Sequence, residues 1–172
     1  KLLAESSGQL TIGWSQSGGD PHEWSVHHKH GDKISSQKVC EIGQQGIIRL
    51  QLDYCYFPAG LPDAIGELGS LERLSLSHCM TIISLPDSLT RLHLLVDLDL
   101  SQCSSLAALP DDFGSLIALK ELDLEGCKSL AALPDSFGQL HVLSTLVLSH
   151  CSSLAVLPDD FGSLGALIEL DL

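Results

Sequence analysis

The stretch LDLEGCKSLAALPDSFGQLHVLST, residues 122–145, is followed without a gap by LVLSHCSSLAVLPDDFGSLGALIE, residues 146–169. The same 24-residue unit continues toward the N-terminus, and each unit reads approximately L-x-L-x-x-C-x-x-L-x-x-L-P-D-x-h-G-x-L-x-x-L-x-x, where h is apolar. Five such units begin at Leu50, Leu74, Leu98, Leu122 and Leu146. Self-similarity at a fixed period of this length is the sequence signature of a repeat architecture. We therefore expect stacked copies of one structural unit.

Two periodicities within the unit predict its local structure. The alternation in LDL and LVL is typical of a short strand that directs its leucines inward. After the cysteine the leucines come every third residue, which indicates an irregular winding. The Pro-Asp pair then begins a short helical turn, with the carboxylate near its N-terminus. A single unit cannot bury its leucines, whereas stacked units can, so the predicted fold is an α/β repeat solenoid, right-handed, with one parallel sheet.

The pattern L-x-x-L-x-L-x-x-C-x-x-L-x-x-L-P, which extends over residues 47–172, resembles the leucine-rich repeat. The segments LSHCSSL and LPDDFGSL are similar to repeats of plant nucleotide-binding disease-resistance receptors. This resemblance implies a horseshoe with the parallel sheet on its concave face. It also implies a non-catalytic protein-recognition module in plant or algal defence or signalling.

The N-terminal part of the chain does not follow the repeat. GWSQSGGDPHEWSV followed by GIIRLQL resembles the N-terminal cap of plant and algal leucine-rich repeat proteins, with Trp14 and Trp24 as the spaced tryptophans. A cap covers leucines that the first unit would otherwise expose. The predicted organisation has three parts: a cap leading into the first strand at 1–49, five repeats at 50–169, and the start of a truncated sixth at 170–172.

Five cysteines recur at intervals of 24 residues, namely Cys55, Cys79, Cys103, Cys127 and Cys151. The resemblance implies that they point inward where each strand turns and bond to backbone groups of the neighbouring turn. Buried thiols of this kind pack as small apolar groups and are inert; a redox or metal-binding ladder is the alternative. The sequence has no Asn, hence no N-glycosylation site, and shows no signal peptide at its start. These features favour a reducing, cytoplasmic location.

The net charge of −13 arises entirely from residues 50–172, which hold 17 acids and 4 bases. Such an acidic field repels nucleic-acid phosphates and anionic lipid headgroups, and it attracts basic partners. No apolar run is long enough to span a bilayer. We therefore expect a protein partner, a basic one, and neither nucleic-acid binding nor membrane insertion.

The outward side chains of the predicted strands form rows across the sheet, because neighbouring strands lie about 4.8 Å apart. Five acids fall on two adjacent strands: Asp97, Asp99, Glu121, Asp123 and Glu125. Like charges that face each other destabilise a sheet, which indicates a compensating basic partner. The alternative is a solvated acidic face that keeps the protein soluble. A second candidate surface, rich in residue types common at interface hot spots, comprises Arg49, Arg73, Tyr54 and His78.

Other functional classes have weaker support. His22, His27, His28 and His30 are weak metal-site candidates, since a zinc site needs three or four ligands and their spacing matches no standard site. The sequence contains no phosphate-binding loop, no H-E-x-x-H and no G-x-S-x-G motif, so we expect no enzyme and no cofactor. Two alternatives stay open. One is an assembly element that self-associates through an uncapped C-terminal repeat, and the other is a sensor of metals or small ligands.

Overall fold

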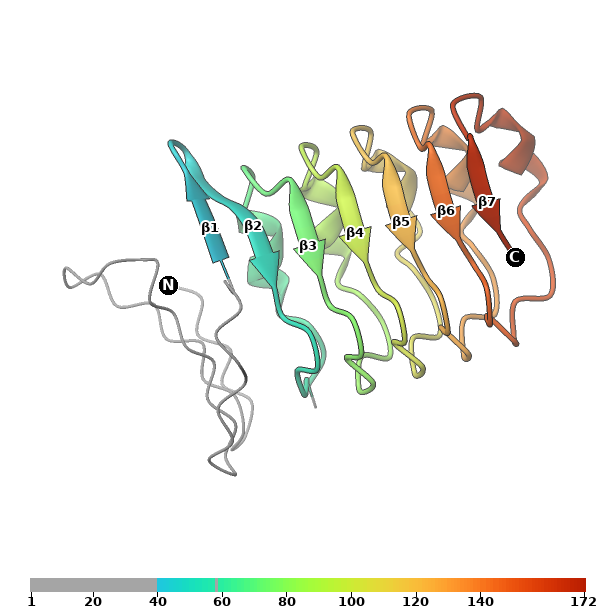
Figure 1. Ribbon diagram of the computed structural model, residues 1–172, viewed down its shortest axis with the longest axis horizontal. Helices are drawn as coiled ribbons and strands as arrows, with labels where there is room; N and C mark the ends of the chain where they lie inside the picture. The colour runs from blue at the N-terminus through green and yellow to red at the C-terminus, as the bar shows by residue number, and fades with distance from the viewer. Residues whose placement is uncertain (1–39, 58) are drawn as a thin grey trace.

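The computed structural model describes residues 40–57 and 59–172, and their core element is one seven-stranded sheet (Figure 1). The strands follow one another across the sheet in chain order. Their bounds are β1 Cys40–Gly43, β2 Gly46–Gln51, β3 Arg73–Ser75, β4 Asp97–Asp99, β5 Glu121–Asp123, β6 Thr145–Val147 and β7 Glu169–Asp171. Strands β2 to β7 are parallel, and β1 pairs antiparallel with β2. The predicted parallel sheet is confirmed.

The register of the sheet repeats the period of the sequence. Leu50 pairs with Leu74, Leu74 with Leu98, and the same offset continues to β7. A strand of three residues buries its central leucine and leaves the two flanking side chains on the opposite side. Equivalent side chains of successive repeats therefore stand side by side across the sheet.

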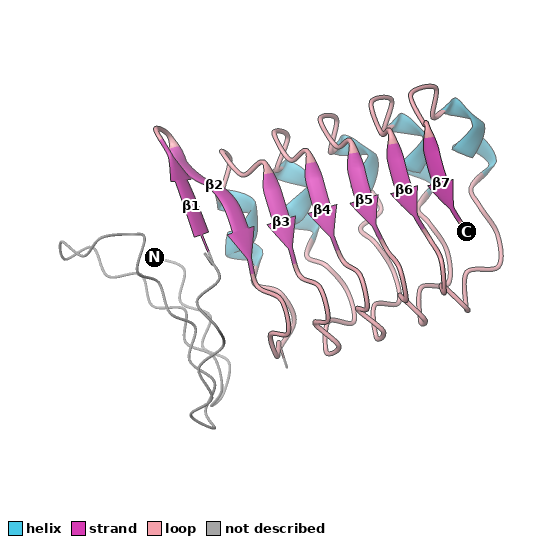
Figure 2. Cartoon of the chain, viewed as in Figure 1, coloured by secondary structure: helices cyan, strands magenta, loops and turns pink. Residues whose placement is uncertain are grey.

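Each repeat returns through a short 3-10 helix, and these helices lie behind the sheet (Figure 2). Their bounds are η2 Asp63–Glu67, η3 Asp87–Arg91, η4 Phe113–Ser115, η5 Asp135–Gln139 and η6 Asp159–Ser163. In η2, η3, η5 and η6 a proline is the N-cap and an aspartate occupies the first turn, as the Pro-Asp pair predicts. The turn is too short for α-helical hydrogen bonding, so the helical layer of the described residues is 3-10 in character.

The core between sheet and 3-10 helices consists of stacked, equivalent side chains. The central leucines of β2 to β6 are buried, and Phe113, Phe137 and Phe161 form a column with ring centroids 6.1 and 6.3 Å apart. Leu89 and Ile65 continue this column in the earlier repeats, and both are fully buried. The core of the first repeat is also buried, though slightly less than that of the internal ones, with Leu52 at 3% exposure and Leu76 at 0%.

The cysteines form the inward ladder that the resemblance implies. The Sγ atoms of Cys79, Cys103, Cys127 and Cys151 each donate to a leucine carbonyl oxygen of the preceding repeat, at 3.1–3.2 Å. Burial raises the pKa of Cys55 to about 12 and that of Cys103 to about 11, since a thiolate would lose its hydration there. The predicted structural role of these thiols agrees with this geometry.

Most of the predicted cap, including Trp14 and Trp24, lies outside the described residues. Strand β1 and the adjoining part of β2 are described, and they extend the sheet beyond the first repeat. Within the described part of the chain, no helix has the length and apolar character needed to cross a membrane.

Candidate protein-binding surface

The side chains that flank the buried strand leucines form two rows on the exposed side of the sheet, which we call the sheet face. Row one precedes the leucine and row two follows it. On β2 to β5, row one comprises Arg49, Arg73, Asp97 and Glu121, and row two comprises Gln51, Ser75, Asp99 and Asp123. Neighbours within a row are paired directly in the register of the parallel strands. The structure thus brings together the row-one and row-two residues that the sequence nominates.

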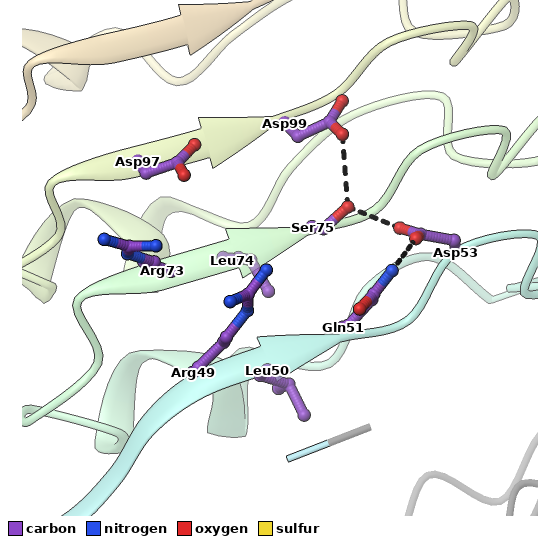
Figure 3. A pocket seen from close by; sticks show the side chains of 9 residues that line it. All are labelled: Arg49, Leu50, Gln51, Asp53, Arg73, Leu74, Ser75, Asp97 and Asp99. Carbon is purple, nitrogen blue, oxygen red and sulfur yellow. Dashed lines mark hydrogen bonds between the residues drawn. The ribbon is translucent and has the colours of Figure 1, made fainter. Parts of the chain in front are cut away.

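The charge of the row-one side chains changes from positive to negative between β3 and β4. Two exposed guanidinium groups, Arg49 and Arg73, stand beside two carboxylates, Asp97 and Glu121. A shallow pocket of about 180 Å³ lies at this change of sign, and Figure 3 shows the side chains around it. Its lining comprises Arg49, Leu50, Gln51, Asp53, Arg73, Leu74, Ser75, Asp97 and Asp99. Opposite charges are therefore presented next to each other on an open surface.

The carboxylates of row two accept hydrogen bonds from their own sheet face. Asp99 accepts from the backbone N–H of Ser101 at 2.9 Å, from its hydroxyl at 2.6 Å, and from the Ser75 hydroxyl at 3.3 Å. Asp123 accepts from the backbone N–H of Glu125 at 2.8 Å. Charge-assisted bonds of this kind offset repulsion between carboxylates. They supply part of the compensation that the sequence led us to assign to a partner.

Asp53, in the next row along the strands, belongs to the same network. Its carboxylate accepts from the Ser77 backbone N–H at 3.1 Å, and also from the side chains of Gln51 and Ser75 (Figure 3). Outward rows on the strands were expected from the sequence, but none of Gln51, Ser75 and Asp53 was nominated. The signal was available, because a Ser or Gln beside a column of acids is a donor at hydrogen-bonding distance.

The carboxylates of row one are different. Among the described residues, none donates a hydrogen bond to the side chain of Asp97 or Glu121. The pKa of Asp97 is raised, first by burial and then by Glu121, although Arg73 opposes the shift. Burial also raises the pKa of Asp123, with Asp99 adding to it and the bond from Glu125 opposing it. The ionised form of Asp97 is therefore disfavoured in the folded protein, and its own repeat does not offset this free-energy cost.

An aromatic pair stands at the carboxyl end of the first strands. The rings of Tyr54 and His78 are stacked, with centroids 4.5 Å apart and planes 6° apart, and Tyr54 is 63% exposed. Both residues have positive φ, 59° and 60°. The position before the cysteine is left-handed in every repeat, the others being Gln102, Gly126 and His150. Gly126 was the sequence signal for this conformation, because glycine tolerates it best.

Metal-ligating clusters are not found within the described residues. The four histidines considered as weak metal candidates, His22, His27, His28 and His30, lie outside that part of the chain.

Glu125 takes part in the sheet face through a long hydrogen bond, 3.5 Å, from the Gln102 amide.

Comparison with known proteins agrees with this geometry. Residues 118–140 match the family model described as Leucine Rich Repeat. The fold is a leucine-rich repeat solenoid. Proteins built from leucine-rich repeats generally act in protein–protein interaction, and the fold is typically a non-enzymatic scaffold. No curated protein matches the chain significantly.

Several solved leucine-rich repeat structures are similar to this chain. The leucine-rich repeat domain of the type III effector XopL is 32% identical, with a TM-score of 0.60, over 65% of this chain and 38% of that one. The ectodomain of the receptor kinase SOBIR1 from Arabidopsis thaliana is 22% identical, with a TM-score of 0.53, over 77% of this chain and 76% of that one. The PEPR1–AtPEP1 structure is also 22% identical, with a TM-score of 0.53, over 83% and 21%. This chain therefore spans little more than a third of the XopL structure, and the likeness to the SOBIR1 and PEPR1–AtPEP1 structures concerns the fold alone.

Proposed function

We propose that this leucine-rich repeat protein is a non-catalytic recognition module that holds a basic protein partner against its sheet face. The observation that carries the proposal is the pair Asp97 and Glu121 in row one. Their charges lie next to each other in register, and no described residue donates a hydrogen bond to either of them. A cationic side chain from a partner would relieve the repulsion between them.

The remaining nominated residues have secondary roles in this proposal. Asp99, Asp123 and Glu125 extend the negative field, although all three already accept hydrogen bonds within the chain, the one to Glu125 being long. Arg49 and Arg73, with the stacked Tyr54 and His78, form a second contact area at the other end of the face. Exposed aromatic and arginine side chains suit such a role.

The biological setting we propose is defence or signalling in a plant or alga. The support is the sequence of the repeats, in particular LSHCSSL and LPDDFGSL, together with the cap-like segment that precedes them. The division into a cap at 1–49, five repeats at 50–169 and the start of another at 170–172 is part of the same proposal.

The test compares two double charge reversals that change the net charge equally. Asp97→Arg with Glu121→Arg places on β4 and β5 the residue that β2 and β3 carry at the same position, so the backbone accommodates the side chain, although four adjacent guanidinium groups repel one another. Asp111→Arg with Asp135→Arg reverses two exposed acids on the side of the 3-10 helices. Proteins captured by the unmodified chain from an extract of its source are identified by mass spectrometry, and their affinities are then measured with purified components.

The proposal predicts that the sheet-face variant loses a partner's affinity by at least about tenfold while the control variant keeps it. Equal loss in both variants would mean that net charge alone attracts the partner. Unchanged affinity in both would move the binding site away from Asp97 and Glu121, toward the arginine end or off the sheet face.

A further inference from the structure

We propose that two copies of this chain associate through their sheet faces, about a two-fold axis that runs parallel to the strands between β3 and β4. The observation that points to this is the order of charges in row one. Across β2, β3, β4 and β5 the order is positive, positive, negative, negative. Such an order is complementary to its own reverse.

The symmetry operation supplies that reverse. A half-turn about the proposed axis lays one sheet face on the other and inverts the order of the strands, so that β3 faces β4 of the second copy and β2 faces β5. Arg73 then lies opposite Asp97 of the second copy, and Arg49 lies opposite Glu121. Because a two-fold interface is isologous, each contact occurs twice. On β2 to β5, row one thus forms opposite-charge contacts at all four positions.

Row two fits the same operation. Gln51 would face Asp123 of the second copy and Ser75 would face Asp99, so a neutral side chain meets each carboxylate. Gln51 keeps one amide hydrogen for this contact, whereas the Ser75 hydroxyl already donates within its own chain. The next row contains one kind of unfavourable contact, Asp53 against Glu125 of the second copy, and it occurs twice. Asp53, however, already accepts hydrogen bonds from its own chain.

The other two-fold arrangement of the faces is disfavoured by the same charges. An axis perpendicular to the strands would keep their order, so β2 would face β2 and β5 would face β5. The arginine ends would then meet each other, and so would the acidic ends, which costs free energy. Charge order therefore selects one orientation.

Two features limit the strength of the association. Each copy has a net charge of −13, which opposes approach. At physiological salt, charges more than about 8 Å apart are largely screened, so contacts at the interface dominate. The contact covers only four short strands, and small interfaces are typical of weak association.

This inference does not depend on the proposed function, because it needs no other protein, but a second copy would occupy the same carboxylates and would compete with a basic partner for them. It is tested on the purified chain by sedimentation equilibrium across a concentration series at physiological salt. The variants are Arg73→Asp, Asp97→Arg, and Asp111→Arg as a control with the same charge change as the second variant, placed on the other side of the molecule. Circular dichroism confirms that each variant is folded.

Self-association of the unmodified chain and of the control is expected to raise the average mass toward twice that of one chain. Each sheet-face variant alone would place like charges at the centre of the interface twice, and its association should weaken by at least about tenfold. An equimolar mixture of Arg73→Asp and Asp97→Arg should associate again, because the two carboxylates at the centre of one variant then face the two guanidinium groups of the other.

Three results would overturn the inference. The unmodified chain could stay monomeric up to the highest concentration tested. The single variants could associate as strongly as the unmodified chain, which would place self-association on another surface. The mixture could fail to recover, which would exclude the proposed two-fold pairing. None of these results bears on whether a different protein binds the same face.

Discussion

Truncation of Asp97 and of Asp99 to alanine should change stability in opposite directions, although both acids lie half-buried on β4 two residues apart. Asp97→Ala removes a charge that burial and Glu121 penalise, and it breaks no hydrogen bond to a described residue. Relief of one repulsive cross-strand pair is worth about 0.5 kcal/mol, so this variant should be as stable as the parent or slightly more stable.

Asp99→Ala instead removes the acceptor for the Ser101 backbone N–H and for the hydroxyls of Ser101 and Ser75. Hydrogen bonds to a charged acceptor contribute about 1.5–3 kcal/mol, and the relief of repulsion with Asp123 returns a fraction of that. We therefore expect a net loss of about 2 kcal/mol in the free energy of unfolding.

The measurement is urea unfolding followed by circular dichroism, with both variants and the parent at pH 7.5. The expected separation between the two variants is about 2.5 kcal/mol, which corresponds to several degrees in melting temperature for a chain of this size. If Asp97→Ala were as destabilising as Asp99→Ala, the distinction between bonded and available carboxylates would be wrong. The main argument for Asp97 as a partner contact would then be lost.

Three further predictions concern particular groups. Asp160→Ser should raise the free energy of unfolding by about 1 kcal/mol, as measured by urea unfolding. The buried Oδ1 atom of Asp160 has no hydrogen-bond partner among the described residues. Ser136, at the same position of the preceding repeat, instead bonds to two backbone groups. The thiol of Cys103 should not react with a thiol reagent at pH 8 unless denaturant is added, since burial raises its pKa to about 11. The reaction is followed by absorbance in a variant that keeps only this cysteine. Lowering the pH from 7 toward 4 should stabilise the fold through Asp97 and Asp123, whose pKa values are raised in the folded state. A carboxyl group of this kind binds its proton more tightly in the folded than in the unfolded chain. The melting temperature of the parent should therefore rise on acidification relative to that of the variant Asp97→Asn with Asp123→Asn.

The fold could be predicted largely from the repeat, because the same constraints recur in each unit. The spacing of Leu74 and Leu98 determines both the strand pairing and its register. The kind of helical turn was less accessible. A sequence such as PDSFG predicts a helical turn, but the choice between α and 3-10 depends on how few residues remain before Leu140 must return to the core.

The rows of the sheet face could also be predicted, since they follow from strand periodicity and the repeat length. The sequence could not distinguish the carboxylates that accept hydrogen bonds from those that do not. Asp97 and Asp99 are the same residue type on the same strand, yet only Asp99 meets donors from its own sheet face. That difference depends on side-chain directions within about an ångström, which a one-dimensional pattern does not encode. The left-handed backbone at Tyr54 and His78 escaped prediction for a related reason, because non-glycine residues rarely adopt it.

The constant offset of 24 residues in the backbone and thiol ladders has an evolutionary consequence. Loss of residues 98–121 would leave every ladder donor with an equivalent acceptor, because the next unit offers the same groups at the same places. It would nevertheless remove Glu121 and place Thr145 directly beside Asp97. Duplication or loss of whole units can therefore rewrite the charge order that a partner meets while the backbone stays the same, and new binding preferences can arise in a single genetic event.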